Sequence, residues 1–361
     1  MKITFVLHYA DWGGGCRVIA TYAHRLIQRG HDVVAIHQTP TLRSRLSDAL
    51  SNILSTARGE HARSHLDTLN IPQICLSEHQ SVTDANIPDA DIVIATYWKT
   101  AREVLALSPA KGAKAYFLQS YEVGFIGSEE EQFKETWTYP MRKILVAPWL
   151  KEIAEREFGD SSGILVPNGV STEQFKAPPR QKCARPTAGF VFHSFGLKGA
   201  DIAIEAFELL RKEIPNLQLI SFGNSWRRSL KNGPSLPKGT EYQVLPPQNR
   251  IRDLYTQCDV WVCPSRNEGY GLPALEAMAC RTPVVSTPTG IAPQLAKQGG
   301  LRLAPHEDPV GLAREIRHIL ELSAYDWANL SQEAYTTAQQ FDVEESARQF
   351  EKALKTVVAG Q

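Results

Sequence analysis

The feature that most constrains the fold is a repeated unit in which an apolar run ends at a turn and a helical segment follows. The first run, KITFVLH, leads into the glycine-rich turn DWGGGC, and then Ile19, Tyr22, Ala23 and Leu26 recur at helical spacing before Gly30. The next apolar run, DVVAIHQ, completes a strand, turn, helix and strand. Because these runs are continuously apolar instead of alternating, they predict parallel strands buried on both faces by helices.

The same unit recurs in both halves of a chain of 361 residues, which is about twice a typical domain length. The proline-rich and basic stretch KAPPRQKCARPTAG separates the two series and has no hydrophobic period, as is typical of a linker. We therefore predict an α/β protein of two doubly wound Rossmann-like domains. Their predicted bounds are 1–170 for the first domain, 171–186 for the linker, 187–340 for the second domain and 341–361 for a final amphipathic helix.

Composition narrows the functional classes. Lys plus Arg and Asp plus Glu each number 39, so the net charge gives no reason to expect a nucleic-acid partner. The six cysteines include no C-x-x-C pair, and the first residues lack the apolar core of a signal peptide. No window approaches the roughly 18 apolar residues of a membrane-spanning helix. These observations predict reduced thiols and a cytoplasmic location.

Two short motifs match known ligand-binding patterns only in part, one for a dinucleotide and one for a metal ion. A nicotinamide-binding G-x-G-x-x-G fingerprint fails, because Val18 occupies the third glycine position and the second strand ends in His37 and Gln38 without a ribose-binding acid. The glycine turn is left as either an anion-approaching helix start or a structural tight turn. The pair Asp89 and Asp91 matches a metal-holding D-x-D, but it precedes a strand, whereas ligands gather at the carboxyl ends of strands. We predict two solvated loop acids and no metal site.

The strongest signal is the stretch RNEGYGLPALEA. Gly269 and Gly271 allow the backbone to approach a ligand, and Pro273 suits the first turn of the helix that follows. The free N–H groups of that helix start favour a diphosphate. Glu268 and Glu276 flank the bend, and a carboxylate can accept hydrogen bonds from two adjacent hydroxyls of a sugar or ribose. The alternative is that Glu276 merely favours a helix start and that Glu268 is solvated.

These residues resemble a known family. Glu268 and Glu276, with seven residues between them, resemble the E-x7-E segment of retaining family 4 glycosyltransferases of the GT-B fold. The stretches ILVPNGVSTEQF, LKGADIAIEAFELL and WGGGCRVIATYAHRLIQRGHDV resemble further segments of that family, in order along the chain. The resemblance implies two domains that face an interdomain cleft, and a terminal helix, 341–361, that crosses back to the first domain.

The resemblance also implies roles for particular residues, with a nucleotide-diphosphate sugar as donor substrate and with neither cofactor nor metal. Lys198 would pair with the diphosphate, Glu268 would hold sugar hydroxyls and Glu276 the ribose hydroxyls. The remaining donor contacts would come from the segment after Glu268 and from the first glycine turn: Gly269, Tyr270, Gly271, Leu272, Gly14 and Gly15.

Two positions depart from the family. His193 stands where an arginine is usual, and histidine grips phosphate with a charge only when it is protonated. Gln119 stands where a histidine is common. His193 is therefore either a third catalytic residue beside Lys198 and Glu268 or a core histidine next to the sheet.

The prediction of an acceptor groove comes from a weaker resemblance to glycosyltransferases that build bacterial surface polysaccharides. It places Gln119, Tyr121 and Glu122 in an acceptor groove, while aromatic core packing accounts equally well for Tyr121 and Trp137. The segment 41–66 has a leucine stripe and several arginines. It fits either a helix packed on the sheet or a helix at a membrane surface near a lipid-linked acceptor.

The sequence thus predicts a metal-independent retaining glycosyltransferase that acts on a glycan or glycolipid acceptor. Three alternatives remain: a GT-B sugar-nucleotide epimerase, a phosphorylase, and a catalytically degenerate nucleotide-sugar-binding partner subunit.

Overall fold

The chain divides into two compact units. The computed structural model describes residues 1–39, 63–78, 80–124, 126–193, 196–223, 230 and 233–360. The first unit consists of residues 1–167 and 344–361, and the second of residues 168–343. Residues 168–186, which include the predicted linker, are therefore part of the second unit. The leucine and arginine segment of residues 41–66 lies almost entirely outside the described residues, so its two interpretations stay predictions.

The first unit contains a parallel sheet of seven strands in the order β3-β2-β1-β4-β5-β6-β7. The strands are β1 (Lys2–Tyr9), β2 (Asp32–Gln38), β3 (Gln73–Leu76), β4 (Ile92–Ala95), β5 (Ala113–Leu118), β6 (Arg142–Leu145) and β7 (Ile164–Leu165). The described helices that pack with it are α1 (Gly14–Gln28), α3 (His65–Thr68), α4 (Trp98–Ala106), α5 (Glu130–Trp137), α6 (Pro148–Phe158) and α13 (Val343–Ala359), with short 3-10 turns at Pro109–Lys111 and Gly127–Glu129. The strands β1 and β4 are adjacent, and the chain winds outward from them in both directions.

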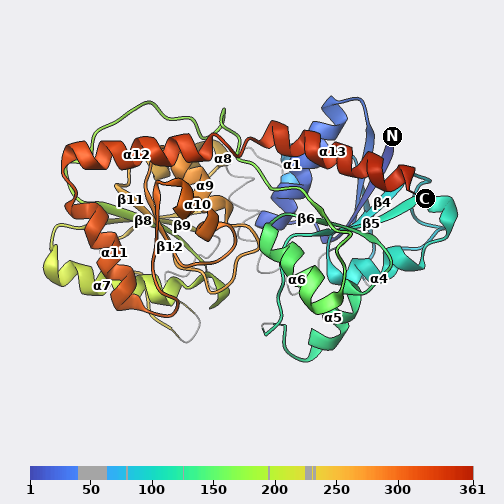
Figure 1. The fold of residues 1–361 in the computed structure, drawn as a ribbon, viewed down its shortest axis with the longest axis horizontal. Coiled ribbons are helices and arrows are strands. Elements are labelled where there is room, and N and C mark those ends of the chain that lie inside the picture. Colours follow the sequence, from blue (N-terminus) through green and yellow to red (C-terminus); the bar gives the residue numbers. More distant parts are fainter. Residues whose placement is uncertain are drawn as a thin grey trace. The chain divides into compact units, whose positions relative to one another are not determined.

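The second unit repeats this plan with six parallel strands in the order β10-β9-β8-β11-β12-β13. These strands are β8 (Thr187–Phe192), β9 (Gln218–Gly223), β10 (Glu241–Val244), β11 (Val260–Cys263), β12 (Val284–Ser286) and β13 (Leu301–Leu303). The helices are α7 (Ala200–Glu213), α8 (Gln248–Thr256), α9 (Leu272–Ala279), α10 (Ala292–Gln298), α11 (Pro309–Glu321) and α12 (Ala324–Ala338), and the 3-10 turn η3 spans Gly196–Lys198. In Figure 1, α7 and α11 cover one face of this sheet, and α9, α10 and α12 lie on the other.

The continuously apolar runs are buried strands, as the sequence predicts. Strand β4 is fully buried along its length, and so are most residues of β1 and β8. In each unit the strand order reverses at one point, between β1 and β4 and between β8 and β11. In open α/β sheets, ligands bind beyond the carboxyl ends of the strands at such a point. The loops that follow these four strands are therefore where the fold favours a ligand site.

The last helix, α13, packs on the first unit although it follows the second in sequence. The ring of Phe350 is fully buried and stacks on Tyr22 of α1 with 4.5 Å between ring centroids. The same ring meets Phe117 of β5 edge-on at 5.0 Å. At the start of the helix, Arg25 pairs with Glu344 at 2.7 Å. Aromatic burial and a surface ion pair thus hold the end of the chain to the first unit.

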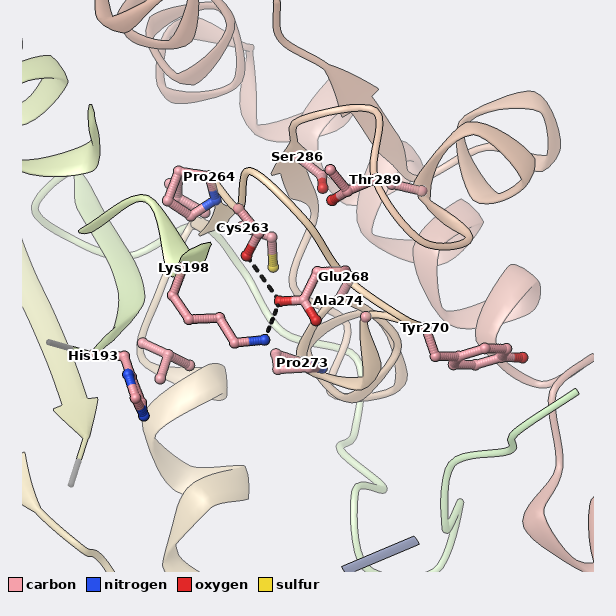
Figure 2. Close-up of a pocket in the computed structure, with 15 residues that line it drawn as sticks. His193, Lys198, Cys263, Pro264, Glu268, Tyr270, Pro273, Ala274, Ser286 and Thr289 are labelled. Atoms are coloured by element: carbon pink, nitrogen blue, oxygen red, sulfur yellow. Dashed lines mark hydrogen bonds and ion pairs between the residues drawn. The ribbon is translucent and has the colours of Figure 1, made fainter. Parts of the chain in front are cut away.

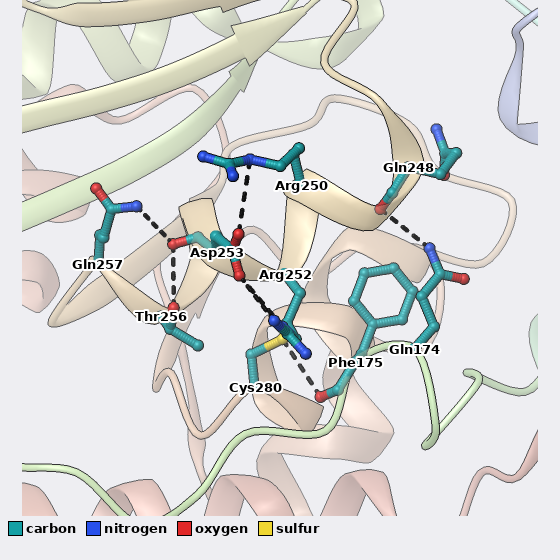
Figure 3. Close-up of polar contacts among 9 residues, drawn as sticks. All are labelled: Gln174, Phe175, Gln248, Arg250, Arg252, Asp253, Thr256, Gln257 and Cys280. Carbon is teal, nitrogen blue, oxygen red and sulfur yellow. Dashed lines mark hydrogen bonds and ion pairs between the residues drawn. The ribbon is translucent and has the colours of Figure 1, made fainter.

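Hydrogen bonds fasten the predicted linker, residues 171–186, to the rest of the second unit. Gln174 donates from Nε2 to the carbonyl of Gln248 at 3.2 Å, and the thiol of Cys280 donates to the carbonyl of Phe175 at 3.4 Å (Figure 3). Further along, the amide of Cys183 donates to a carboxylate oxygen of Asp259 at 2.7 Å. A segment whose composition is typical of a flexible linker is therefore held in place along most of its length.

Of the helices that the structure describes, none combines the length and the apolar character needed to cross a membrane.

Candidate functional site

A pocket lies at the carboxyl ends of β8 and β11 in the second unit, at the point where the strand order reverses. The space between its walls is about 580 Å³ when the open solvent at its mouth is included. Figure 2 shows the side chains of its wall. They come from β8, β11 and β12, from the loops after these strands, and from the starts of α9 and α10: Val191, His193, Lys198, Val262, Cys263, Pro264, Ser265, Glu268, Tyr270, Gly271, Pro273, Ala274, Ser286, Thr289 and Ala292.

Lys198 and Glu268 form an ion pair in the wall of this pocket. The ammonium nitrogen of Lys198 lies 2.8 Å from Oε1 of Glu268, and the same oxygen accepts a hydrogen bond from the hydroxyl of Ser265 at 2.8 Å (Figure 2). The loops that carry them touch at Gly199, where φ is 61° and an added Cβ would lie 2.0 Å from the carbonyl oxygen of Pro264. Only glycine fits there, which explains the LKG sequence.

The start of α9 forms another part of the wall. Gly271 precedes the helix with a φ of 96°, a left-handed conformation that favours glycine, and Pro273 stands in the first turn as predicted. Among the residues that the structure describes, none caps this helix start with its side chain, so the N–H groups there can face an anion. The backbone before it is fixed by the amide of Ile291, which donates to the carbonyl of Tyr270 at 3.0 Å.

His193 directly follows β8 and lies half-buried beside Lys198 (Figure 2). Burial lowers the pKa of this imidazole, the positive charge of Lys198 lowers the pKa further, and Glu268 acts in the opposite direction. His193 is therefore neutral at pH 7 in the donor-free protein and does not supply the permanent charge of an arginine.

Glu276 is placed differently from Glu268. It is buried inside α9, and its Oε2 accepts a hydrogen bond from the phenol of Tyr255 at 2.8 Å. It is not part of the pocket wall, so the two glutamates that frame the motif in sequence differ in exposure and in partners. Sequence reasoning did not find Tyr255, which comes from α8, because nothing in the local sequence pairs it with Glu276.

The first glycine turn belongs to the other unit. Helix α1 begins at Gly14, after Gly13, whose amide donates to Asp11 at 2.8 Å. Gly14 and Gly15 are exposed, and a Cβ on Gly14 would meet no atom within 4 Å. Gln119, which follows β5, donates from Nε2 to the carbonyl of Gly15 at 3.3 Å. The structure thus brings Gln119 to the glycine turn, at the carboxyl edge of the first sheet.

The other two predicted acceptor residues make contacts within the first unit. The phenol of Tyr121 donates to Glu157 at 2.5 Å, and its ring meets the fully buried Trp137 edge-on at 5.1 Å. Glu122 accepts a hydrogen bond from the hydroxyl of Ser120 at 2.9 Å. Aromatic core packing therefore accounts for Tyr121 and Trp137.

The pair of the D-x-D motif precedes β4, at the amino end of the strand. Asp89 pairs with Lys111 at 2.7 Å, and Asp91 accepts a hydrogen bond from the amide of Lys2 at 2.7 Å. Both acids have partners that tie β4 to its neighbours. In the part of the chain that the structure describes, no three His, Cys, Asp or Glu side chains are grouped as metal ligands would be.

Comparison with solved structures identifies the fold. The chain superposes with a TM-score of 0.77 on Anabaena Alr3699/HepE in complex with UDP and glucose, covering 99% of this chain and 100% of that one at 16% identity. Sucrose-phosphate synthase from Thermosynechococcus elongatus gives 0.72, with 100% of both chains covered at 17% identity. A glycosyltransferase from Rickettsia africae gives a TM-score of 0.73, with 100% of this chain and 99% of that chain covered at 16% identity. The two doubly wound domains are therefore those of the GT-B fold, and the predicted fold class is confirmed.

Sequence comparison narrows the class for the second unit. Residues 171–340 match the family of glycosyl transferases group 1. A D-inositol 3-phosphate glycosyltransferase of Acidothermus cellulolyticus is 30% identical over 185 residues, which cover 44% of this chain and 40% of that protein. The O-antigen biosynthesis protein RfbC of Myxococcus xanthus is 28% identical over 242 residues, which cover 64% and 18%. The aligned regions thus span less than half of these curated relatives. The pocket therefore lies within the part of the chain that this family model matches.

Proposed function

We propose that this protein is a retaining glycosyltransferase of family 4. It would transfer a sugar from a nucleotide-diphosphate sugar to a glycan or lipid-linked acceptor in the synthesis of a bacterial surface polysaccharide. The observation that carries this proposal is the pocket itself, in which a lysine and a carboxylate meet beside an uncapped helix start at the carboxyl edge of the sheet.

The donor fits this pocket by charge. A diphosphate carries negative charge, and both the ammonium of Lys198 and the N–H groups at the start of α9 favour an anion. Both groups would also offset the charge that grows on the leaving phosphate as the glycosidic bond breaks. Glu268 would then exchange part of its contact with Lys198 for the hydroxyls of the donor sugar.

The proposed reaction needs no side-chain nucleophile. The acceptor oxygen forms a bond to the anomeric carbon on the face from which the diphosphate leaves, and the bond between that carbon and the phosphate oxygen breaks. The acceptor proton passes to the released nucleoside diphosphate. Glu268 is assigned to hydroxyls of the donor sugar, and Glu276 is buried outside the pocket wall, so neither is proposed as a nucleophile. This front-face route is therefore the proposed mechanism, and it retains the configuration at the anomeric carbon.

Catalysis without a metal is part of the proposal. Its support is the ammonium of Lys198 and the uncapped start of α9, which supply positive charge where a metal would otherwise act. Asp89 and Asp91, in contrast, are bound to Lys111 and to the amide of Lys2 at the other end of the strands. Transfer that continues at full rate in excess EDTA supports this part of the proposal. Loss of transfer that returns with Mg²⁺ or Mn²⁺ overturns it.

One experiment tests the donor class directly. A thermal-shift panel of UDP-glucose, GDP-mannose, ADP-glucose and dTDP-glucose should raise the melting temperature with at least one donor, because a ligand that binds only the folded state stabilises it. The donor that binds is then incubated with acceptor candidates and without free phosphate. Release of nucleoside diphosphate together with a new glycoside of unchanged anomeric configuration supports the proposal. Interconversion of the free sugar nucleotide would identify an epimerase, and a requirement for inorganic phosphate would identify a phosphorylase.

A second candidate function is favoured by His193. Its lowered pKa leaves the pocket with one side-chain cation, Lys198, among the residues that form its wall. A degenerate subunit that binds a nucleotide sugar without turning it over would fit this weaker charge. Donor binding in calorimetry combined with neither transfer nor hydrolysis under any acceptor condition would select this candidate.

A further inference from the structure

Arg266 follows Ser265 of the pocket wall in the chain, and its side chain joins three segments of the second unit. Its Nη1 donates to the carbonyl of Gly196 at 2.7 Å and to Asp201 at 2.9 Å, and its Nη2 donates to the other carboxylate oxygen of Asp201 at 2.7 Å. Its Nε donates to Oε1 of Glu307 at 2.5 Å, and its Nη2 donates to Oε2 of Glu307 at 3.0 Å. The five N–H groups of a guanidinium match these five contacts. Arg266 therefore binds η3, the first turn of α7 and the loop after β13 at once.

The backbone at Arg266 also binds the segment that carries Lys198. The amide of Arg266 donates to the carbonyl of Leu197 at 2.8 Å, and the amide of Asn267 is within 3.4 Å of the same oxygen. Gly199 touches the carbonyl of Pro264 on the far side of Lys198. The segment that carries Lys198 is thus pinned to the segment before Glu268 on both sides of the ion pair.

Arg266 is not a replacement for the arginine that His193 displaces. It is absent from the pocket wall, and its side chain is 23% exposed with both carboxylates in direct contact. The hydrogen bonds from Arg266 hold the pKa of Asp201 below its ordinary value, so that carboxylate stays charged and keeps its hold on the guanidinium at neutral pH. To reach a phosphate, Arg266 would have to give up one of these charged partners, which is unfavourable.

We propose that Arg266 is a positioning residue that fixes the Lys198 segment against Glu268, so that the lysine ammonium is already in place when a nucleotide diphosphate enters the pocket. This inference rests on the proposed function for its catalytic consequence. The physical reason is that lysine has a flexible four-carbon side chain with a point charge, so its placement depends on a fixed backbone. A displacement of about 1 Å at such a group can lower a rate about 100-fold.

The experiment compares four variants in the full chain: Arg266→Ala, Lys198→Ala, the double variant, and Arg317→Ala. Arg317 is the matched control, because it also pairs with an acid of α7, Glu213 at 2.5 Å, but near the last turn of that helix. Two readouts are taken well below the melting temperature of every variant. The first is hydrolysis of the donor that stabilises the native chain among UDP-glucose, GDP-mannose, ADP-glucose and dTDP-glucose. The second is deuterium exchange of the donor-free protein.

We expect Arg266→Ala to slow donor hydrolysis about 10- to 100-fold, with most of the loss in kcat, while Arg317→Ala matches the native chain. The double variant should be no slower than Lys198→Ala, because two residues that act through one group are not additive. Exchange should rise in residues 196–203 and 264–268 of Arg266→Ala and stay unchanged elsewhere. Native rates and native exchange in Arg266→Ala overturn the proposal, as does a double variant whose loss is the product of the single losses.

Two further variants keep the inference testable if Arg266→Ala does not fold. Arg266→Lys retains one charge but cannot span Asp201 and Glu307 together, and Asp201→Asn weakens the grip on the guanidinium at one end. Both should show intermediate losses of rate and the same local rise in exchange, and native behaviour in both overturns the proposal. If no donor binds the native chain, the proposed function fails. The exchange experiment then still decides whether Arg266 fixes the Lys198 segment.

Discussion

The ammonium of Lys198 lies 2.8 Å from a carboxylate oxygen of Glu268, although the two residues are 70 positions apart in the chain. One follows β8 and the other follows β11, and these strands are neighbours in the sheet. Parallel pairing brings their carboxyl ends together, so the fold and not the local sequence creates the pair.

Replacing Lys198 by alanine should lower kcat/KM for donor hydrolysis or transfer by about 100- to 1,000-fold. The reason is that the ammonium stabilises charge that develops on the leaving diphosphate. The free energy of unfolding should change by less than about 1 kcal/mol, because the side chain is 37% exposed and a surface ion pair contributes little. Steady-state kinetics and urea denaturation give the two values. An unchanged kcat/KM would remove Lys198 from the mechanism.

Replacing Glu276 by alanine should weaken binding of the donor and of its nucleoside diphosphate by at least 10-fold, if the carboxylate holds the ribose. Tyr255→Phe removes the hydrogen bond to Oε2 and should raise KM with little change in kcat, since a ribose contact is the same in the ground state and in the transition state. Calorimetry with the nucleoside diphosphate measures the change in binding, and steady-state kinetics measure KM and kcat. Equal dissociation constants in Glu276→Ala and the native chain would assign Glu276 to helix packing alone.

Donor affinity should increase as the pH falls from 8 toward 6. In the donor-free protein burial and Lys198 lower the pKa of His193, so the imidazole is neutral at the start of this range. A diphosphate nearby favours the protonated form, so binding takes up a proton and is strengthened by lower pH, by up to about 10-fold per pH unit. Calorimetry at several pH values checks the slope. His193→Gln should flatten it, and a flat profile in the native chain would mean that His193 does not contact the phosphate.

Replacing Phe350 by alanine should lower the free energy of unfolding of the first unit by about 3 to 5 kcal/mol, the usual cost of a large cavity in an aromatic core. Phe350 is fully buried against Tyr22 and Phe117. Lys355→Ala is the control, because that side chain lies on the same helix, is 59% exposed, and its loss should cost under about 0.5 kcal/mol. Guanidinium denaturation followed by circular dichroism compares them. Equal midpoints would show that α13 is not needed for the stability of the first unit.

The sequence by itself determined the fold class and the start of the helix that contributes to the pocket wall. Its buried apolar runs, each followed by a helix, are sufficient to predict parallel strands, because strands covered on both faces have no polar side. Its local turn residues are sufficient to predict the start of α9, since Gly271 has a left-handed conformation that favours glycine and proline is suited to the first turn of a helix. Such features depend on residues within a few positions of one another.

Only the tertiary structure decided which distant residues meet. It paired Glu268 with Lys198 at the pocket and buried Glu276 against Tyr255, although the sequence places both glutamates in one motif. It also revealed Arg266 as the residue that joins the loops after β8 and β11. The physical reason is that these contacts depend on the order of the strands in the sheet and on the side of α9 that faces the core, and neither is encoded within a single short segment.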